Sequence, residues 1–228
     1  MRVQCYIFVT DFKNSLMQKI KNIIFDYGNV IFEIDFRIAQ NALAQLGIPD
    51  VDTFFGHKGH NNLFDLLETG AITTAEFRDG IRSAAQKNGL SDQEIDAAWN
   101  SLLIGVKPQT QDVLLQVKEK YRTFLLSNTN QIHFDYIMQY LQDEFQVPDN
   151  SHLFEKAYYS HEMKLRKPHV EIFQQVLQEN NLEPAETLFI DDSPQHLVGA
   201  KAAGLHTLLM TENPANLGSF LKNNGINF

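Results

Sequence analysis

The feature that most constrains the fold of this chain is a series of short apolar runs that each end in polar residues. Such runs, without polar alternation, are typical of strands buried on both faces of a parallel sheet. Stretches with helical periodicity lie between them, and this alternation predicts an α/β fold with a doubly wound, Rossmann-like parallel sheet. The predicted strands are residues 23–25, 123–126, 187–190 and 206–210, with 157–160 as a weaker fifth; the predicted helices are 110–120, 170–180 and 197–203.

Residues 37–107 depart from this alternation, because helical periodicity runs through almost the whole segment. We interpret the segment as a small helical cap domain inserted after the first strand, above the sheet edge where open α/β folds bind ligands. The alternative is a separate sequential domain, which would detach the first strand from its sheet. The predicted domains are a core of residues 19–36 and 108–228, the cap at 37–107 and an N-terminal extension at 1–18. Within the cap, helices are predicted at 38–46, 63–67, 74–88 and 92–103.

Charge and cysteine content narrow the possible partners. The 228 residues carry 19 Lys and Arg against 28 Asp and Glu, a formal net charge of −9. An acidic surface repels a phosphate backbone, so nucleic acid is not an expected partner. The single cysteine excludes an internal disulfide and a cysteine-rich zinc site, which fits a cytoplasmic location. No apolar stretch is long enough to span a membrane, and the sequence does not determine the oligomeric state.

Polar side chains follow several of the predicted strands. Asp26 follows the first, Ser127 and Asn128 follow the second, and Asp191 and Asp192 follow the fourth. Adjacent carboxylates repel each other unless a cation or hydrogen bonds compensate, and Mg²⁺ suits such carboxylates. With a basic loop at 164–167, these groups at one sheet edge form the inventory for phosphoryl transfer through an aspartyl intermediate. Taken singly, each also has a structural interpretation: a turn-forming Asp, a Ser or Thr capping a helix that starts near Ile132, and a solvated basic loop.

Four segments, in this order, carry a family resemblance: FDYGNV, LLSNTN, KLRKPHVEIF and FIDDSPQHLVGAKAAG. From about residue 21 to 211 the chain resembles the haloacid dehalogenase superfamily, in its phosphatase-rich branch. The phrase LETGAITTAEF within the predicted cap is similar to the helical cap of that branch. The resemblance therefore implies a hydrolase that acts on a small phosphomonoester, with α-D-glucose-1-phosphate phosphatases as one similar group.

The resemblance also implies roles for individual residues. Asp26 would attack phosphorus and form an aspartyl phosphate that water then hydrolyses. Ser127 would donate its hydroxyl to a phosphate oxygen, and Lys167, which directly precedes Pro168, would pair with phosphate and with Asp26. The implied catalytic residues are Asp26, Ser127 and Lys167, and the implied substrate-binding residues are Ser127, Asn128, Lys167 and Tyr27. The implied Mg²⁺ ligands are Asp26, the Gly28 carbonyl and Asp192, with Asp191 close by or acting through water.

Gly28 departs from the pattern of many family phosphatases, which carry there a second Asp that protonates the leaving group. Glu33 and Asp35 are candidates to supply that proton. The glycine argues against a phosphomutase, and it keeps two alternatives open. One is a 2-haloacid dehalogenase, which lacks the second Asp and needs no Mg²⁺, although the Asp191 and Asp192 pair favours a phosphatase. The other is a catalytically weak relative that binds a ligand.

Three further expectations concern the surroundings of the site. A polar and aromatic patch at residues 54–61, which includes His57 and His60, is expected to meet the leaving group, with a surface loop as the structural alternative for the two histidines. Trp99 is expected in the core. His196 is expected to be structural, because the neighbouring aspartates already supply carboxylates. The expected ligand is a small phosphorylated metabolite.

Overall fold

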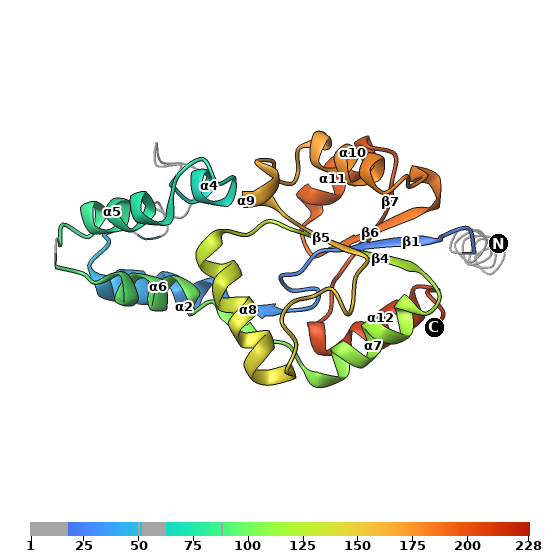
Figure 1. Ribbon diagram of the computed structural model, residues 1–228, viewed down its shortest axis with the longest axis horizontal. Coiled ribbons are helices and arrows are strands. Elements are labelled where there is room, and N and C mark those ends of the chain that lie inside the picture. Colours follow the sequence, from blue (N-terminus) through green and yellow to red (C-terminus); the bar gives the residue numbers. More distant parts are fainter. Residues whose placement is uncertain (1–17, 50, 52–62, 88) are drawn as a thin grey trace, which may run out of the picture.

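The computed structural model describes residues 18–49, 51, 63–87 and 89–228. Within these residues lies a five-stranded sheet with the order β5-β4-β1-β6-β7, and all of its strand pairs are parallel (Figure 1). All five predicted strands are present, and the α/β fold with a parallel sheet is confirmed. The strands are β1 Asn22–Phe25, β4 Arg122–Ser127, β5 Lys156–Tyr159, β6 Thr187–Asp191 and β7 His206–Leu209.

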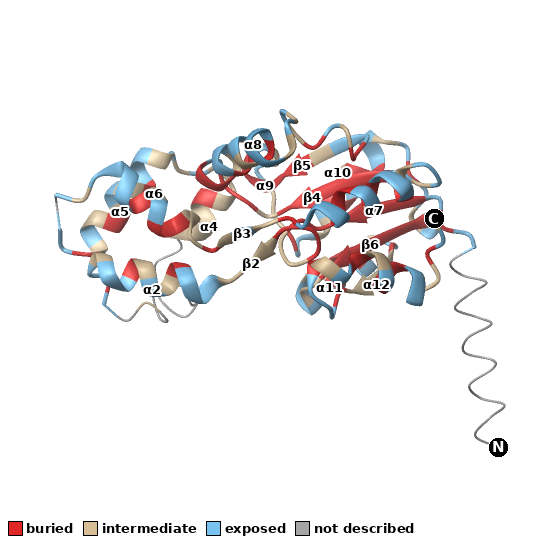
Figure 2. Ribbon diagram, turned by 90° about the horizontal axis from the view of Figure 1, so that it is seen from below, coloured by how far each residue is buried: buried red, intermediate tan, exposed pale blue. Residues whose placement is uncertain are grey.

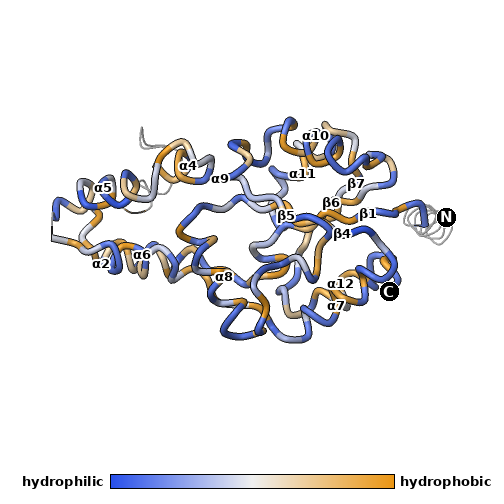
Figure 3. The backbone as a smooth tube through the Cα atoms, viewed as in Figure 1, coloured by the Kyte–Doolittle hydropathy of each residue, from blue (hydrophilic) through white to orange (hydrophobic). Residues whose placement is uncertain are grey.

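Helices cover both faces of the sheet, which is why the apolar residues of the central strands follow one another without polar alternation (Figure 3). In β1, Ile23 and Phe25 pack into one hydrophobic cluster and Ile24 packs into the other, and all three are fully buried. Successive side chains of a strand point to opposite faces, so a strand between two helical layers needs no polar alternation. One face carries α7 Pro108–Lys118, α8 Gln131–Phe145 and α12 Leu217–Asn223; the other carries α10 Val170–Glu179 and α11 Pro194–Ala202.

Between β1 and α7, the described residues contain four helices that form a separate hydrophobic cluster beside the sheet (Figures 1 and 2). Reciprocal capping of Thr73 with Glu76 and of Ser91 with Glu94 starts two of them, and Gly47 ends another at a φ of 106°. They are α2 Phe36–Leu46, α4 Leu63–Glu68, α5 Thr74–Ala84 and α6 Asp92–Asn100. β1 lies between β4 and β6, so the interpretation that detaches the first strand from its sheet does not describe the structure. The domain boundaries at 37 and 107 stay predictions.

A short antiparallel pair joins these helices to the sheet layer and was not predicted. It consists of β2 Glu33–Ile34 and β3 Leu103–Gly105 (Figure 2). The predicted helix at 92–103 therefore ends earlier, at Asn100, and the one at 74–88 ends at Ala84 because Gln86 adopts a left-handed φ of 52°. Strands of this length carry too little pattern for recognition in a sequence.

The part of the chain that the structure describes also contains three short helical segments: α9 Ser160–Met163, η1 Pro184–Glu186 and η2 Pro214–Asn216. A search of the described residues finds no helix with the length and apolar character that crossing a membrane requires. The N-terminal extension predicted at 1–18 falls, apart from Gln18, outside the described residues.

Candidate active site

The register of the parallel strands brings the predicted residues to one edge of the sheet. Phe25 is paired with Leu125 of β4 and with Ile190 of β6. Asp26 directly follows Phe25, while Ser127 and Asp191 lie at the ends of the two neighbouring strands. Side chains that are about 60 to 160 residues apart in the chain therefore meet where the three strands end, which is the ligand-binding edge of open α/β folds.

Lys167 lies between two of these carboxylates. Its Nζ is 2.6 Å from Asp26 Oδ1 and 2.8 Å from Asp191 Oδ2, and its side chain has no exposed surface. Burial alone would lower the pKa of Lys167, but the two carboxylates outweigh burial and raise it above the ordinary lysine value. The two carboxylates therefore favour the charged form of Lys167 at the floor of the site.

Asp26 is held in a fixed orientation. Its Oδ1 accepts a hydrogen bond of 2.7 Å from the backbone N–H of Tyr27 in addition to the contact with Lys167. Burial raises the pKa of Asp26 well above the ordinary value, with Lys167 acting in the opposite direction and Asp191 adding to the rise. One lysine therefore does not compensate all the negative charge gathered here.

Asp191 contacts three neighbouring groups at the base of the site. Its Oδ1 accepts from the backbone N–H of Ser193 at 2.7 Å, and its Oδ2 contacts Lys167 and lies 2.9 Å from His196 Nδ1. Burial would raise the pKa of Asp191, but Lys167 and His196 overcome it and hold the pKa below the ordinary value. Both oxygens are thus engaged by protein groups, and the expected place of Asp191 at the metal, directly or through water, stays a prediction.

A cavity lies above these residues, and the groups that face it fit a divalent cation. Asp26, Gly28 and Asp192 line it, and burial followed by the charge of Asp191 raises the pKa of Asp192. With Asp191, three carboxylates stand against the single ammonium of Lys167, so the site lacks positive charge. A hard cation that binds carboxylate and carbonyl oxygens would supply it.

A second group of possible metal ligands consists of Asp26, Asp191 and His196, whose ligand atoms lie within 4.8 Å of one another. We favour the first group, because Lys167 and Ser193 already occupy the oxygens of Asp191. His196 contacts Asp191 through its ring, which agrees with the expected structural role. His196 also lines the cavity, which was not expected.

Two predicted substrate-binding side chains have other partners. The Tyr27 hydroxyl is buried and donates to Asn150 Oδ1 at 3.4 Å, so the side chain has a partner within the protein, and a role of Tyr27 in substrate binding stays a prediction. Asn128 lines the cavity, but its Nδ2 donates to the Lys167 carbonyl at 3.0 Å and its Oδ1 accepts from the Lys167 N–H at 2.9 Å. Since both ends of the amide are used, Asn128 holds the backbone of Lys167.

Ser127 is available for a ligand. Its hydroxyl makes only a long hydrogen bond of 3.5 Å to the carbonyl of Asn128. The alternative that Ser127 or Thr129 caps the next helix is wrong, because Asn130 is the N-cap of α8 and accepts from the N–H of His133. A hydroxyl at the end of β4 that no cap requires is placed to donate to a phosphate oxygen.

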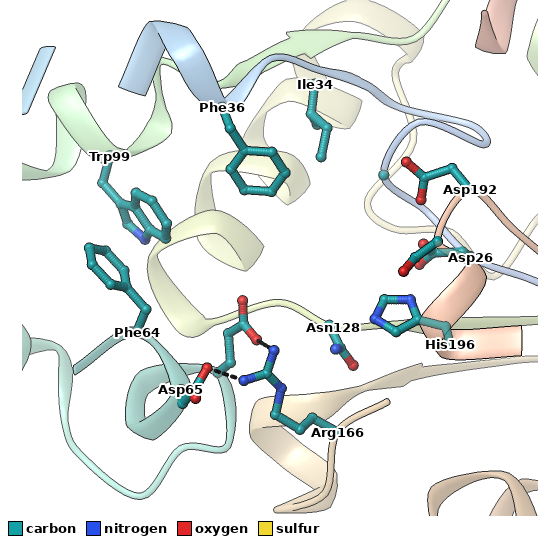
Figure 4. A pocket seen from close by; sticks show the side chains of 13 residues that line it. Asp26, Ile34, Phe36, Phe64, Asp65, Trp99, Asn128, Arg166, Asp192 and His196 are labelled. Carbon is teal, nitrogen blue, oxygen red and sulfur yellow. Dashed lines mark hydrogen bonds and ion pairs between the residues drawn. The ribbon is translucent and has the colours of Figure 1, made fainter. Parts of the chain in front are cut away.

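The cavity above these residues has a volume of about 330 Å³ and lies between the sheet edge and residues of α2, α4 and α6 (Figure 4). Such a volume is suited to a small metabolite. Trp99 is buried in the helical cluster, as expected, and it also lines the cavity. Its ring stacks on His133 of α8 with centroids 4.5 Å apart, which ties α6 to the core layer. The apolar walls are Ile34, Phe36, Phe64 and Trp99.

The space beside Gly28 is occupied by Ile34. A Cβ atom at residue 28 would lie 2.9 Å from Ile34 Cδ1, so an acidic side chain there would meet an apolar one. Neither proposed substitute faces the cavity. Asp35 caps α2 and pairs with Arg37, whose hydrogen bonds lower the pKa of Asp35, and Glu33 accepts from Asn213. The prediction that Asp35 or Glu33 is the general acid is therefore not supported.

The sequence did not predict the ion pairs of Arg166 at the cavity, and the structure does not test the predicted patch at residues 54–61. Arg166 belongs to the predicted basic loop, but its ion pairs with Asp65 and Glu68 of α4 were not predicted. Opposite charges on a loop and on a helix far from it in sequence give no local signal. The patch at 54–61 with His57 and His60 lies outside the described residues.

Comparison with known proteins agrees with this geometry. Residues 20–204 match the haloacid dehalogenase-like hydrolase family, and this range contains β1, β4, β5 and β6, the helices beside the sheet and all four motifs. The chain belongs to this family. Its membership makes the chain a hydrolase by descent and confirms the resemblance inferred from the motifs.

Individual relatives cover nearly the same part of the chain. D-ribitol-5-phosphate phosphatase of Bacteroides thetaiotaomicron is 32% identical over 197 residues, which are 86% of this chain and 94% of the relative. A family enzyme of the same organism, solved in complex with magnesium and inorganic phosphate, is 38% identical with a TM-score of 0.77 over 87% of this chain and 98% of its own. A family hydrolase from Porphyromonas gingivalis is 30% identical with a TM-score of 0.79, over 90% and 98% of the two chains.

Proposed function

We propose that the chain is a Mg²⁺-dependent phosphatase that hydrolyses a small phosphomonoester, with Asp26 as the nucleophile. The observation that carries the proposal is the contact between buried Lys167 and Asp26 at the floor of a cavity that Asp192 also lines. Two dense negative charges, carboxylate and phosphate, approach each other only where cations neutralise them. The relative named as a ribitol phosphate phosphatase and the relative bound to magnesium and phosphate support the same reaction.

The chain's own residues account for binding and attack. Lys167 and the Ser127 hydroxyl bind oxygens of the phosphoryl group. Lys167 and the Tyr27 N–H both contact Oδ1 of Asp26, and we assign Oδ2 as the oxygen that attacks phosphorus. The new bond joins Oδ2 to phosphorus while the bond from phosphorus to the ester oxygen breaks. Water then attacks the same phosphorus, which releases inorganic phosphate and restores the Asp26 carboxylate.

Asp26, the Gly28 carbonyl and Asp192 would hold Mg²⁺. When bound, the ion supplies positive charge that lets phosphate enter beside the carboxylates. The ester oxygen leaves as an alkoxide that must gain a proton. Residue 28 is a glycine next to apolar Ile34, so water supplies that proton, either during departure or, for a better leaving group such as an anomeric oxygen, after departure.

The proposed substrate is a phosphorylated sugar or related metabolite, and we place the reaction in the cytoplasm because the chain has a single cysteine. We further propose that residues 37–107 act as a cap domain over a core of 19–36 and 108–228. In this arrangement, the cap contacts the leaving group while the core contacts phosphate, because the cavity has walls from both.

The test is a panel of phosphomonoesters, measured with Mg²⁺ and with a chelator, on the native chain and on Asp26→Asn. We expect hydrolysis that stops with the chelator and in the variant, while Asp79→Asn, an exposed carboxylate of α5, behaves as the native chain. Release of halide from a 2-haloacid in the presence of chelator would instead identify a dehalogenase. Tight binding of a phosphate ester without turnover would identify a ligand-binding relative.

A further inference from the structure

Ser160 is a buried serine at the same sheet edge as the site, and its hydroxyl has no task in the proposed mechanism. Tyr159, the last residue of β5, is paired with Ser127, the last residue of β4. Ser160 follows Tyr159 and has no exposed surface. It also begins α9, which lies beside α4 of the proposed cap (Figure 1). A buried hydroxyl in this place can contact the sheet layer and the cap together.

The Ser160 hydroxyl holds the backbone of Thr129. Its Oγ accepts a hydrogen bond of 2.9 Å from the Thr129 N–H and lies 2.9 Å from the Thr129 carbonyl oxygen. Thr129 belongs to the segment 128–130 that joins β4 to α8, which we call the β4 loop. The preceding residue, Asn128, binds the backbone of Lys167. Two consecutive residues of the β4 loop are thus fixed to other parts of the core.

The same hydroxyl reaches the end of α4. Ser160 Oγ lies 2.7 Å from the carbonyl oxygen of Glu68, the last residue of that helix. A hydroxyl has one proton to donate, and the Glu68 carbonyl is the nearer of its two acceptors, so we assign the proton to Glu68. Thr129 then donates to a hydroxyl that itself donates to α4, and successive hydrogen bonds of this kind strengthen one another.

Close packing of α4 against α9 keeps the Glu68 carbonyl within reach. A Cβ atom on Gly70 would lie only 2.5 Å from the backbone oxygen of His161, and the φ of Gly70 is +59°. Lys164 Nζ also donates to the Gly70 carbonyl at 3.0 Å. A side chain at residue 70 would therefore separate the two helices and lengthen the contact between Ser160 and Glu68.

We propose that Ser160 is a positioning residue that couples the β4 loop to α4, so that the Ser127 hydroxyl is placed to bind a phosphoryl oxygen while α4 lies against α9. Ser127 directly precedes the β4 loop, whereas Ser160 does not line the cavity and acts through Thr129. This proposal rests on the proposed phosphatase function and adds a link between its two halves. Because α4 supplies part of the cavity wall, contacts of the leaving group with α4 would also favour binding of the phosphoryl group.

Inorganic phosphate is the probe, because it reports on the phosphoryl end of the site without a leaving group. Calorimetry in the presence of Mg²⁺ gives its dissociation constant, and p-nitrophenyl phosphate gives kcat and KM. We expect Ser160→Ala to weaken phosphate binding by about fivefold or more, as the loss of one hydrogen bond implies.

Thr123→Val is the matched control for lost stability. It also removes a buried hydroxyl, one that donates to the Leu153 carbonyl at 2.8 Å near the other end of β4. Urea unfolding should show a loss of stability in both variants, whereas phosphate binding should weaken only in Ser160→Ala. Equal phosphate affinities in the two variants would mean that Ser160 has a structural role alone.

Gly70→Ala tests the coupling while it leaves the Ser160 hydroxyl and the β4 loop unchanged, so it also serves if Ser160→Ala does not fold. The added methyl group should displace α4 from α9 and weaken phosphate binding by about threefold or more. In the double variant with Ser160→Ala, the two effects should not multiply, because the connection is already broken. Native phosphate affinity in Gly70→Ala, or effects that multiply, would overturn the coupling.

The native chain separates a failure of this proposal from a failure of the proposed function. If it binds phosphate and hydrolyses p-nitrophenyl phosphate, but Ser160→Ala binds phosphate as well as Thr123→Val does, the positioning role is wrong and the phosphatase assignment stands. If the native chain with Mg²⁺ neither binds phosphate nor hydrolyses any phosphomonoester, the proposed function fails and the role of Ser160 fails with it.

Discussion

Lys167 Nζ lies 2.6 Å from Asp26 Oδ1, although the lysine side chain is completely buried. The same ammonium lies 2.8 Å from Asp191 Oδ2, so one buried cation pairs with two carboxylates. Asp26 directly follows β1, and Asp191 is the last residue of β6. Burying these charges costs desolvation free energy. Removing one partner costs more, because the other charge then stays buried without compensation. The lysine is therefore structural as well as chemical.

Replacement of Lys167 by Met should consequently abolish phosphatase activity and lower the free energy of unfolding by about 3–5 kcal/mol. Urea unfolding at neutral pH measures the second effect. Lys156→Met is the control, because Lys156 is half exposed and pairs with Glu179 at the surface, and its loss should cost about 1 kcal/mol or less. Equal losses for the two variants would contradict the importance of the buried pair.

Replacement of Gly28 by Ala tests the contact with Ile34. The new Cβ would lie 2.9 Å from Ile34 Cδ1, and we expect destabilisation of about 1–3 kcal/mol together with reduced activity. Ile34→Val removes the Cδ1 atom, so the double variant should lose less stability than the sum of the two single variants. Thermal or urea unfolding of the four proteins gives this coupling energy, and strict additivity would show that the two side chains do not compete.

His133 gives the stability a defined pH dependence. Burial lowers the pKa of His133 from 6.5 to about 4, so the unfolded chain binds this proton more strongly than the folded one. Stability from the neutral ring is complete above about pH 6.5 and declines as the pH falls toward 4, by about 2–3 kcal/mol at pH 4.5. The measurement compares urea unfolding of the native chain and of His133→Gln above pH 6.5 and at pH 4.5. A difference between them that does not change with pH would contradict the burial of a neutral ring.

Asp191 and Asp192 are adjacent, but we expect different effects from their removal. Asp192→Asn should keep the fold and raise the Mg²⁺ concentration for half-maximal activity by about tenfold or more, because Asp192 faces the cavity. Asp191→Asn should lower stability, because its oxygens hold Lys167, Ser193 and His196. Mg²⁺ titrations and unfolding curves distinguish the two variants. Identical behaviour in both assays would disprove the division of roles.

The sequence alone predicted those site residues that lie at or directly after the ends of strands. Asp26, Ser127 and Asp191 meet because each is at or directly after a strand end, and strand ends are visible as the limits of apolar runs. Lys167 was distinguished from Lys164 and Arg166 by its place before Pro168 within the family motif. In the structure, Lys167 contacts Asp26 and Asp191, which agrees with that choice.

Side-chain partners that are distant in sequence were not predictable. The Tyr27 hydroxyl points to Asn150, which lies 123 residues further along the chain, and no periodicity connects the two. Asn128 directly follows Ser127, so the sequence suggested a substrate ligand, but the side-chain amide of Asn128 binds the backbone of Lys167, 39 residues away. Hydrogen-bond partners depend on how the elements pack together, which local patterns do not contain.

The β2 and β3 pair has a consequence for how such a chain can change. Glu33 is paired with Gly105 and Ile34 with Leu103, so the chain leaves the sheet layer and returns to it through neighbouring strands. The chain between these strands, residues 35–102, therefore begins and ends at points that are already joined. A different insert, longer or shorter, could therefore replace the present one by recombination or design without moving β1 or the carboxylate that follows it, and substrate range could change while the hydrolytic chemistry is inherited intact.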